Sequence, residues 1–98
     1  LMVDAVLSRL HAIVRGRVQG VSFRYFVHDQ AHYLDITGWV RNRFDGSVEV
    51  MAEAPRAQLE LLLQQLHQGP PAAHVTAVQA EWLEATGEFI SFWVSSTA

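Results

Sequence analysis

The chain of 98 residues is half hydrophobic and 17% charged, with a formal net charge of −3, as expected for one small globular domain without a second core. It has no cysteine, which excludes disulfides, cysteine–zinc sites and thiol nucleophiles and is compatible with a reducing cytoplasm. No apolar run approaches the ~18 residues of a membrane span, and the N-terminal segment LMVDAVLSRL is too short and too acidic for a secretory signal. We therefore expect a single cytoplasmic domain over residues 1–98, without a membrane partner.

Hydrophobic periodicity and turn residues predict an alternation of strands and helices. The elements are a strand over Arg9–Arg15, a helix over Ser22–Leu34, strands over Ile36–Arg43 and Ser47–Ala54, a helix from Pro55 to Gly69, and strands over Val75–Leu83 and Phe89–Ser95. An Asp-Gly pair at residues 45–46 favours a hairpin between the second and third strands, because it tolerates positive φ. We expect residues 96–98 to be frayed. The buried helix stripes are predicted to be Phe23, Phe26, Val27, Ala31 and Leu34, then Leu59, Leu62, Leu63 and Leu66.

The order βαββαβ with a final edge strand is that of an α+β fold, the ferredoxin-like split βαβ sandwich. Two helices cover one face of an antiparallel sheet in this fold. The first two strands run in the same direction with the third between them, so their C-terminal ends lie at one edge, roughly 10 Å apart. The loop Gly16–Ser22 and the side chain of Asn42 are therefore predicted to converge on one site.

Residues 16–24 read GRVQGVSFR and point to phosphate binding. Gly16 and Gly20 free the backbone to curl, and a curled loop that opens a helix directs several N–H groups into one hollow beside the positive end of the helix dipole. Arg24, in the first helical turn, adds a planar charged fork. The alternatives are an ordinary surface salt bridge for Arg24 and a turn role for Asn42 ahead of the Asp-Gly pair.

The charges are distributed unevenly along the chain. Residues 1–43 hold six arginines against three acids, a balance of +3, whereas residues 44–98 hold one arginine against seven acids, a balance of −6. Chance clustering on a solvated face would explain any single arginine. We expect a local field that attracts anions, because five of the seven lie in or beside two short motifs: Arg15, Arg17, Arg24, Arg41 and Arg43.

The motif GRVQGVSFR and the later segment GWVRNRFDGSVEV, residues 38–50, together closely resemble the acylphosphatase family, over about Leu10 to Val94. The resemblance implies a monomeric, metal-free and cofactor-free enzyme that hydrolyses acyl phosphates to a carboxylate and inorganic phosphate. It implies catalytic roles for Arg24, on the phosphoryl group, and Asn42, on the nucleophilic water. The phosphoryl group, or a phosphate or sulfate ion, would be held by the loop backbone of Gly16, Arg17, Val18, Gln19, Gly20, Val21 and Ser22.

The chemistry of an acyl phosphate agrees with this reading. It releases a carboxylate whose conjugate acid has a pKa of about 4 to 5, so the leaving group needs neither a metal nor an acid. Positioning and charge stabilisation of the transferring phosphoryl group are sufficient. One departure is visible: the family usually has glycine at the end of the first helix, where this chain has Asp35. A left-handed residue other than glycine should cost up to about 1 kcal/mol of stability there.

A non-catalytic ferredoxin-like module is the main alternative. An RNA-binding version would carry stacking aromatics and basic residues on its third strand, whereas Ser47–Ala54 reads SVEVMAEA and the pI is about 5.9. We therefore expect no nucleic-acid partner. A regulatory module that binds phosphate without turnover, and a domain of a larger carbamoyl-transfer protein, are open alternatives. The apparent completeness of the short chain favours a free-standing enzyme.

The segment HDQAH, residues 28–32, imitates the zincin pattern HExxH. It has Asp in place of Glu and no third ligand, and helical geometry puts His28 and His32 opposite the apolar stripe, in solvent. A triad of Ser22, His28 and Asp29 fails, because residues so close on one helix cannot form the required relay. We therefore expect no metal site, and we assign the three tryptophans to sheet faces rather than to a cofactor site.

Overall fold

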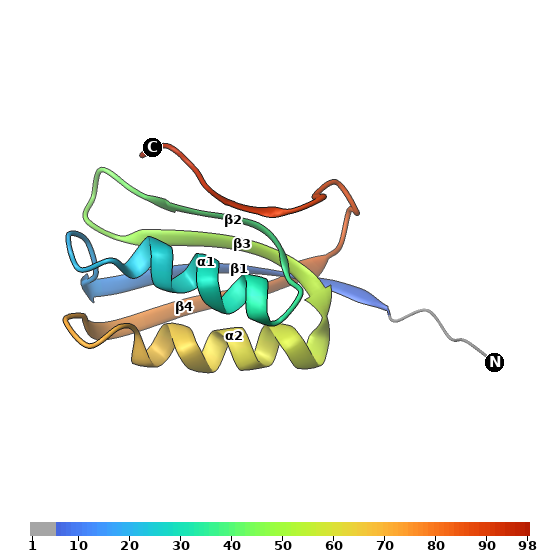
Figure 1. The fold of residues 1–98 in the computed structure, drawn as a ribbon, viewed down its shortest axis with the longest axis horizontal. Helices are drawn as coiled ribbons and strands as arrows, with labels where there is room; N and C mark the ends of the chain where they lie inside the picture. Colours follow the sequence, from blue (N-terminus) through green and yellow to red (C-terminus); the bar gives the residue numbers. More distant parts are fainter. Residues whose placement is uncertain (1–5) are drawn as a thin grey trace.

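The computed structural model describes residues 6–98 and has the predicted α+β ferredoxin-like architecture. The elements are β1 (Leu7–Arg17), α1 (Phe23–Tyr33), β2 (Thr37–Asn42), β3 (Val48–Pro55), α2 (Arg56–Gln68), β4 (His74–Glu84) and β5 (Phe92–Val94). The strand order is β4-β1-β3-β2-β5, and both helices lie on one face of the sheet (Figure 1). As predicted, β1 and β2 run in the same direction with β3 between them.

The sheet is mixed, so the prediction of an antiparallel sheet is wrong at one edge. β5 pairs in parallel with β2, with Trp93 opposite Trp39. The reason is topological: the chain reverses after β4 and crosses to the far edge, so β5 takes the direction of β2. β5 is also shorter than the predicted strand Phe89–Ser95, because the residues before it are used in the crossing.

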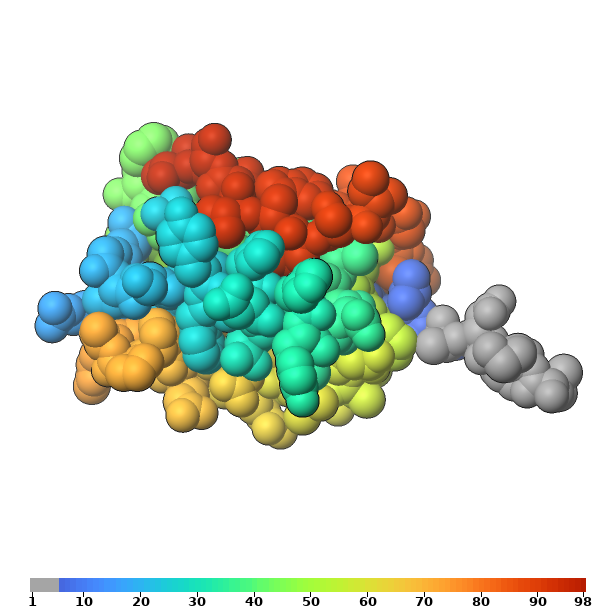
Figure 2. All heavy atoms as spheres, viewed as in Figure 1, coloured from blue at the N-terminus to red at the C-terminus, as the bar shows by residue number. Residues whose placement is uncertain are grey.

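The chain after β5 stays beside β2, so the prediction that residues 96–98 are frayed is wrong. The N–H of Ser95 donates to the carbonyl of Val40 at 2.8 Å, and the N–H of Ala98 donates to the carbonyl of Asn42 at 3.1 Å. The carbonyl of Ala98 in turn accepts a hydrogen bond from the N–H of Phe44 at 3.0 Å. In the space-filling view this C-terminal segment, in red, lies along the edge of the molecule next to α1 (Figure 2). The final residues thus border the end of β2.

The first strand runs two residues further than predicted. β1 includes Gly16 and Arg17, which pair with β4 after a bulge between Arg15 and Gly16. Gly16 has φ 122°, and a Cβ atom there would stand 2.1 Å from the carbonyl oxygen of His74. The bulge therefore requires glycine. The loop proper begins at Val18, so part of the predicted phosphate loop belongs to the sheet.

The core lies between the helices and the sheet, and the predicted helix stripes are confirmed. α1 buries Phe23, Val27 and Ala31, whereas α2 buries three leucines, Leu59, Leu62 and Leu66. The other predicted stripe residues are half-buried against this core: Phe26, Leu34 and Leu63. Neither helix of the described chain is long and apolar enough to cross a membrane.

The three tryptophans lie on the sheet, as predicted. Trp39 and Trp93 face each other across β2 and β5, on the side away from the helices, and the guanidinium of Arg41 covers the Trp39 ring. Trp82 of β4 packs against the core beneath the guanidinium of Arg56. The predicted left-handed residue at the end of α1 is also present, since Asp35 has φ 56°.

Candidate active site

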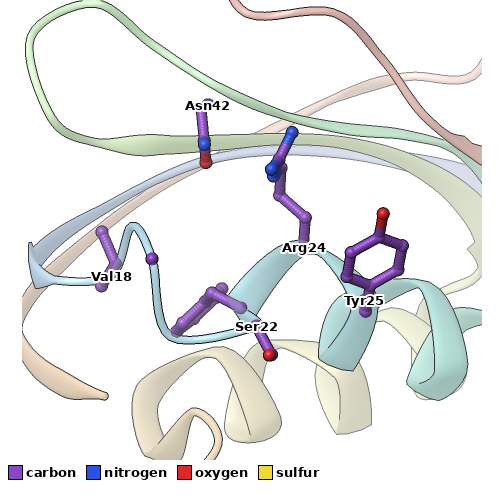
Figure 3. A pocket seen from close by; sticks show the side chains of 7 residues that line it. Val18, Ser22, Arg24, Tyr25 and Asn42 are labelled. Atoms are coloured by element: carbon purple, nitrogen blue, oxygen red, sulfur yellow. The ribbon is translucent and has the colours of Figure 1, made fainter. Parts of the chain in front are cut away.

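A pocket of about 210 Å³ opens where the loop after β1, the first turn of α1 and the end of β2 meet. The sheet register explains why Asn42 faces it. Val48 of β3 pairs with both Val14 of β1 and Asn42 of β2, so side-chain alternation puts all three on the helix-covered face. The lining residues are Val18, Gly20, Ser22, Phe23, Arg24, Tyr25 and Asn42 (Figure 3).

The loop backbone presents N–H groups at the start of α1. Gly20 and Ser22 have φ 72° and 64°, and Ser22, at the N-cap of α1, makes no capping bond with its side chain. Within residues 6–98, the N–H groups of residues 20–25 donate no hydrogen bond, whereas the N–H of Phe26 already bonds the carbonyl of Ser22 at 3.0 Å. Free N–H groups at the positive end of a helix suit an anion.

Asn42 carries an unpaired buried acceptor into this pocket. Its side-chain oxygen Oδ1 is buried and accepts no hydrogen bond from the described residues. A buried polar atom without a partner costs about 1–3 kcal/mol of stability, so such atoms are rare and need a reason. Figure 3 shows the Asn42 side chain extending from β2 toward the loop and α1. The alternative of a turn role is wrong, because Asn42 belongs to β2 and its side chain makes no bond to the turn.

Arg24 supplies an unpaired positive charge beside that amide. Its side chain extends from the first turn of α1 toward β2 (Figure 3). Among residues 6–98, Arg24 makes no ion pair and no side-chain hydrogen bond, so the alternative of an ordinary salt bridge is not realised. The pocket thus combines a cation, free N–H donors and a free amide.

The predicted field of five arginines is smaller than expected, because three of them are paired. The guanidinium of Arg41 bonds Glu49 at 2.7 Å, and Arg15 and Arg43 lie 3.5 and 3.9 Å from the carboxylate of Asp45. Hydrogen bonds from the hydroxyl and N–H of Ser47, aided by the two arginine charges, lower the pKa of Asp45 to about 2. Apart from Arg24, Arg17 is the one member of the five without an ion pair in the described chain.

The structure divides the predicted loop residues by role. Val18, Gly20 and Ser22 line the pocket, whereas Gly16 and Arg17 belong to β1 and do not. Val21 is also absent from the pocket wall, and its side chain is buried in the core. The pocket residues that sequence reasoning missed are Phe23, which was assigned to the core alone, and Tyr25, to which no role was assigned.

Gln19 does not line the pocket, and its side chain ties the loop to the hairpin between β2 and β3. Its side-chain nitrogen donates to the carbonyl of Arg43 at 2.7 Å and to the carbonyl of Ser47 at 2.9 Å. The same hairpin is closed by a backbone bond from Arg43 to Ser47 at 2.9 Å. Because Asn42 directly precedes Arg43, this amide fixes the loop relative to Asn42. Sequence patterns could not have revealed this contact, because Gln19 meets the hairpin only in the folded structure.

The two histidines of HDQAH lie together but form no larger cluster. The rings of His28 and His32 stack with centroids 6.4 Å apart. Within residues 6–98 no group of three or more histidine and acidic side chains could hold a metal ion. The prediction that both face solvent is wrong for His28, which is half-buried against the ring of Phe92 at 6.3 Å. The cause is β5, which packs against α1 on that side.

Known proteins of this fold and sequence define the family. A sequence model described as acylphosphatase matches residues 10–94. Over 88 residues the chain is 50% identical to an acylphosphatase of Pelotomaculum thermopropionicum, covering 90% of this chain and 96% of the relative. The structure matches that of acylphosphatase from Bacillus subtilis with a TM-score of 0.87 and 36% identity, covering 90% of this chain and 98% of the other. The chain belongs to the acylphosphatase family and is an enzyme of that family.

One further likeness concerns the fold alone. Full-length HypF in its phosphate- and nucleotide-bound form matches with a TM-score of 0.84 but 24% identity. The match covers 93% of this chain and only 12% of HypF. The same small sandwich is therefore found within a much larger protein.

Proposed function

We propose that this enzyme hydrolyses the carboxyl–phosphate bond of acyl phosphates by in-line attack of a water molecule on a phosphoryl group. Arg24 and the backbone of residues 18–22 hold the phosphoryl group, and Asn42 holds the water. One observation carries the proposal: N–H donors, an arginine and a buried amide oxygen, all without partners among residues 6–98, line the same pocket. An anion and a water molecule would form hydrogen bonds with these groups.

The residues of the pocket match the needs of the reaction. The carboxylate leaving group needs no protonation, so the protein must stabilise charge on the equatorial phosphoryl oxygens and align the water. N–H groups and a guanidinium provide the first, because both are donors that cannot lose their proton near neutral pH. The amide of Asn42 provides the second, since it offers both a donor and an acceptor to one water. No general base is required.

The test is phosphate release from benzoyl phosphate by the purified chain, before and after extensive treatment with EDTA. We expect turnover that survives chelation, and unchanged kcat/KM within a few-fold when His28→Gln and His32→Gln are combined. Binding of inorganic phosphate without any turnover would instead identify a phosphate-binding regulatory module. Loss of activity on chelation, restored by zinc, would identify the HDQAH segment as a metal site and refute the mechanism.

A further inference from the structure

Tyr25 forms an exposed aromatic wall of the pocket that binding of a phosphoryl group leaves unused. Its side chain stands on the first turn of α1 beside Arg24 (Figure 3). The residue is 63% exposed, and within residues 6–98 its ring stacks on no other ring and lies under no arginine. A large aromatic surface at the rim of a polar pocket is available to a ligand.

The other lining residues offer no comparable apolar surface. Val18 and Phe23 are 1% and 2% exposed, and Gly20 has no side chain and open space around it. The remaining lining residues apart from Tyr25 are polar. An apolar group that enters this pocket therefore finds one exposed side chain to pack against.

The direction of the reaction brings the acyl group toward that side chain. This step rests on the proposed function, in which the attacking water lies at Asn42. In-line displacement requires the leaving group on the opposite side of the phosphorus from the attacking oxygen. Arg24 stands between Asn42 on β2 and Tyr25 on α1 (Figure 3), so the side opposite Asn42 is the side of the first turn of α1.

We propose that the Tyr25 ring contacts the acyl group and makes the enzyme selective for acyl phosphates with aromatic or other large apolar acyl groups. A tyrosine ring buries much apolar area while immobilising only two side-chain torsions, so it binds flat groups at low entropic cost. A small acyl group such as acetyl would not reach across the ring. The phosphoryl contacts are the same for both kinds of substrate, so selectivity resides in Tyr25.

The experiment compares kcat/KM for benzoyl phosphate and acetyl phosphate in the wild type, Tyr25→Ala, Tyr25→Phe and Tyr33→Ala. Tyr33 is the matched control because it is a tyrosine on the same helix, 83% exposed, but absent from the pocket wall. We expect the wild type to favour benzoyl phosphate and Tyr25→Ala to lower the benzoyl-to-acetyl ratio of kcat/KM by about tenfold. Tyr25→Phe, which keeps the ring, should keep the ratio, and Tyr33→Ala should not change it.

A second measurement separates binding of the acyl group from turnover. Phenylphosphonate and methylphosphonate carry an aromatic or a small group but cannot be hydrolysed in this way, so their inhibition constants report binding alone. We expect Tyr25→Ala to weaken phenylphosphonate selectively and inorganic phosphate hardly at all. An unchanged substrate ratio, or an equal fall in Tyr33→Ala, would overturn the role of Tyr25 while the proposed function stands. A wild type that hydrolyses neither substrate would refute the proposed function itself.

Discussion

Arg9 and Arg24 lie near the two ends of β1 and differ in their partners. Arg9 bonds the carboxylate of Glu53 at 2.6 Å, pairs with Glu88, and covers the ring of Phe89 at 5.0 Å. Arg24 has no partner among residues 6–98 and stands beside an unpaired amide. An arginine paired with carboxylates of the fold holds that fold together, whereas one left free beside free donors and acceptors is available to a ligand.

The cluster around Arg9 shows how paired polar groups hold the fold. Glu53 is 2% exposed and accepts hydrogen bonds from the N–H groups of Thr86 and Gly87 at 2.8 and 3.0 Å. Burial by itself would raise the pKa of Glu53, but these bonds and the Arg9 guanidinium lower it below its usual value. The network holds the crossing between β4 and β5 against β3, which keeps β5 beside β2.

The largest effect in this comparison should come from Arg24→Ala. Removing a donor from developing charge typically costs ~10²–10³ in rate, so we expect kcat/KM to fall at least that far while the melting temperature stays unchanged. Arg24→Lys should recover little, because a point charge cannot reproduce the planar fork. Steady-state kinetics and thermal unfolding together make the measurement. A variant that kept more than half of wild-type activity would disprove this site.

Asn42→Ala should separate water positioning from phosphate binding. We expect kcat to fall by roughly 10²-fold, comparable to the loss of other transition-state hydrogen bonds, with little change in competitive inhibition by inorganic phosphate. Stability should not fall, because the substitution removes a buried acceptor that has no hydrogen-bond partner among residues 6–98. If phosphate affinity declined as far as activity, Asn42 would contact the phosphoryl group instead of the water.

Glu53→Gln should show the opposite behaviour, a loss of stability without a loss of activity. Removing one charge from a buried ionic network lowers the free energy of unfolding by several kcal/mol. Because Arg9 keeps Glu88 as a partner, we expect a loss of about 2–3 kcal/mol here. Urea unfolding gives the free energy, and Glu84→Gln, an exposed residue of β4 without an ion pair in the described chain, is the matched control. Unchanged stability of Glu53→Gln would show that the network does not anchor the crossing.

Acid should affect the paired region before it affects the chemistry. The pKa values of Glu49, Glu53 and Asp45 are lowered in the folded state, that of Asp45 to about 2. Their contribution to stability is therefore complete above the unfolded values and is lost as the pH falls below them, for Asp45 between about 3.8 and about 2. Activity should vary little between about pH 5 and 8, since Arg24 stays charged and Asn42 does not titrate. A bell-shaped rate profile that disappears in the double histidine variant would contradict this.

The smallest effect should come from Asp35→Gly at the end of α1. Asp35 has φ 56° and is exposed, so glycine should relieve left-handed strain and raise stability by up to about 1 kcal/mol. Asp35→Ala keeps a Cβ atom and should not stabilise the chain. Both variants should leave kcat/KM unchanged, because Asp35 lies at the far end of α1 from the pocket. Equal stabilities for the glycine and alanine variants would contradict this prediction. They would show that the backbone relaxes around the Cβ atom of residue 35, so that the left-handed conformation costs no stability.

Local patterns predicted most of the fold. Helical periodicity located the stripes from Phe23 to Ala31 and from Leu59 to Leu66, because burying an apolar stripe requires that spacing whatever the partner. The strand order predicted that Asn42 and the loop before Arg24 converge, because it brings the ends of β1 and β2 to one edge, and both side chains line one pocket. The family resemblance, confirmed by known acylphosphatases, supplied their proposed roles.

Other features depend on partners far apart in sequence, and only the tertiary structure decided them. The pairing of Arg15 with Asp45, and the lack of a partner for Arg24 among residues 6–98, follow from which side chains the sheet brings within reach. The parallel direction of β5 depends on the crossing that Glu53 holds in place. By itself, the sequence determined the elements and the motif, because backbone periodicity and turn chemistry act over a few residues. The tertiary structure decided which polar groups stay unpaired in the pocket, because pairing depends on atoms that meet only after folding.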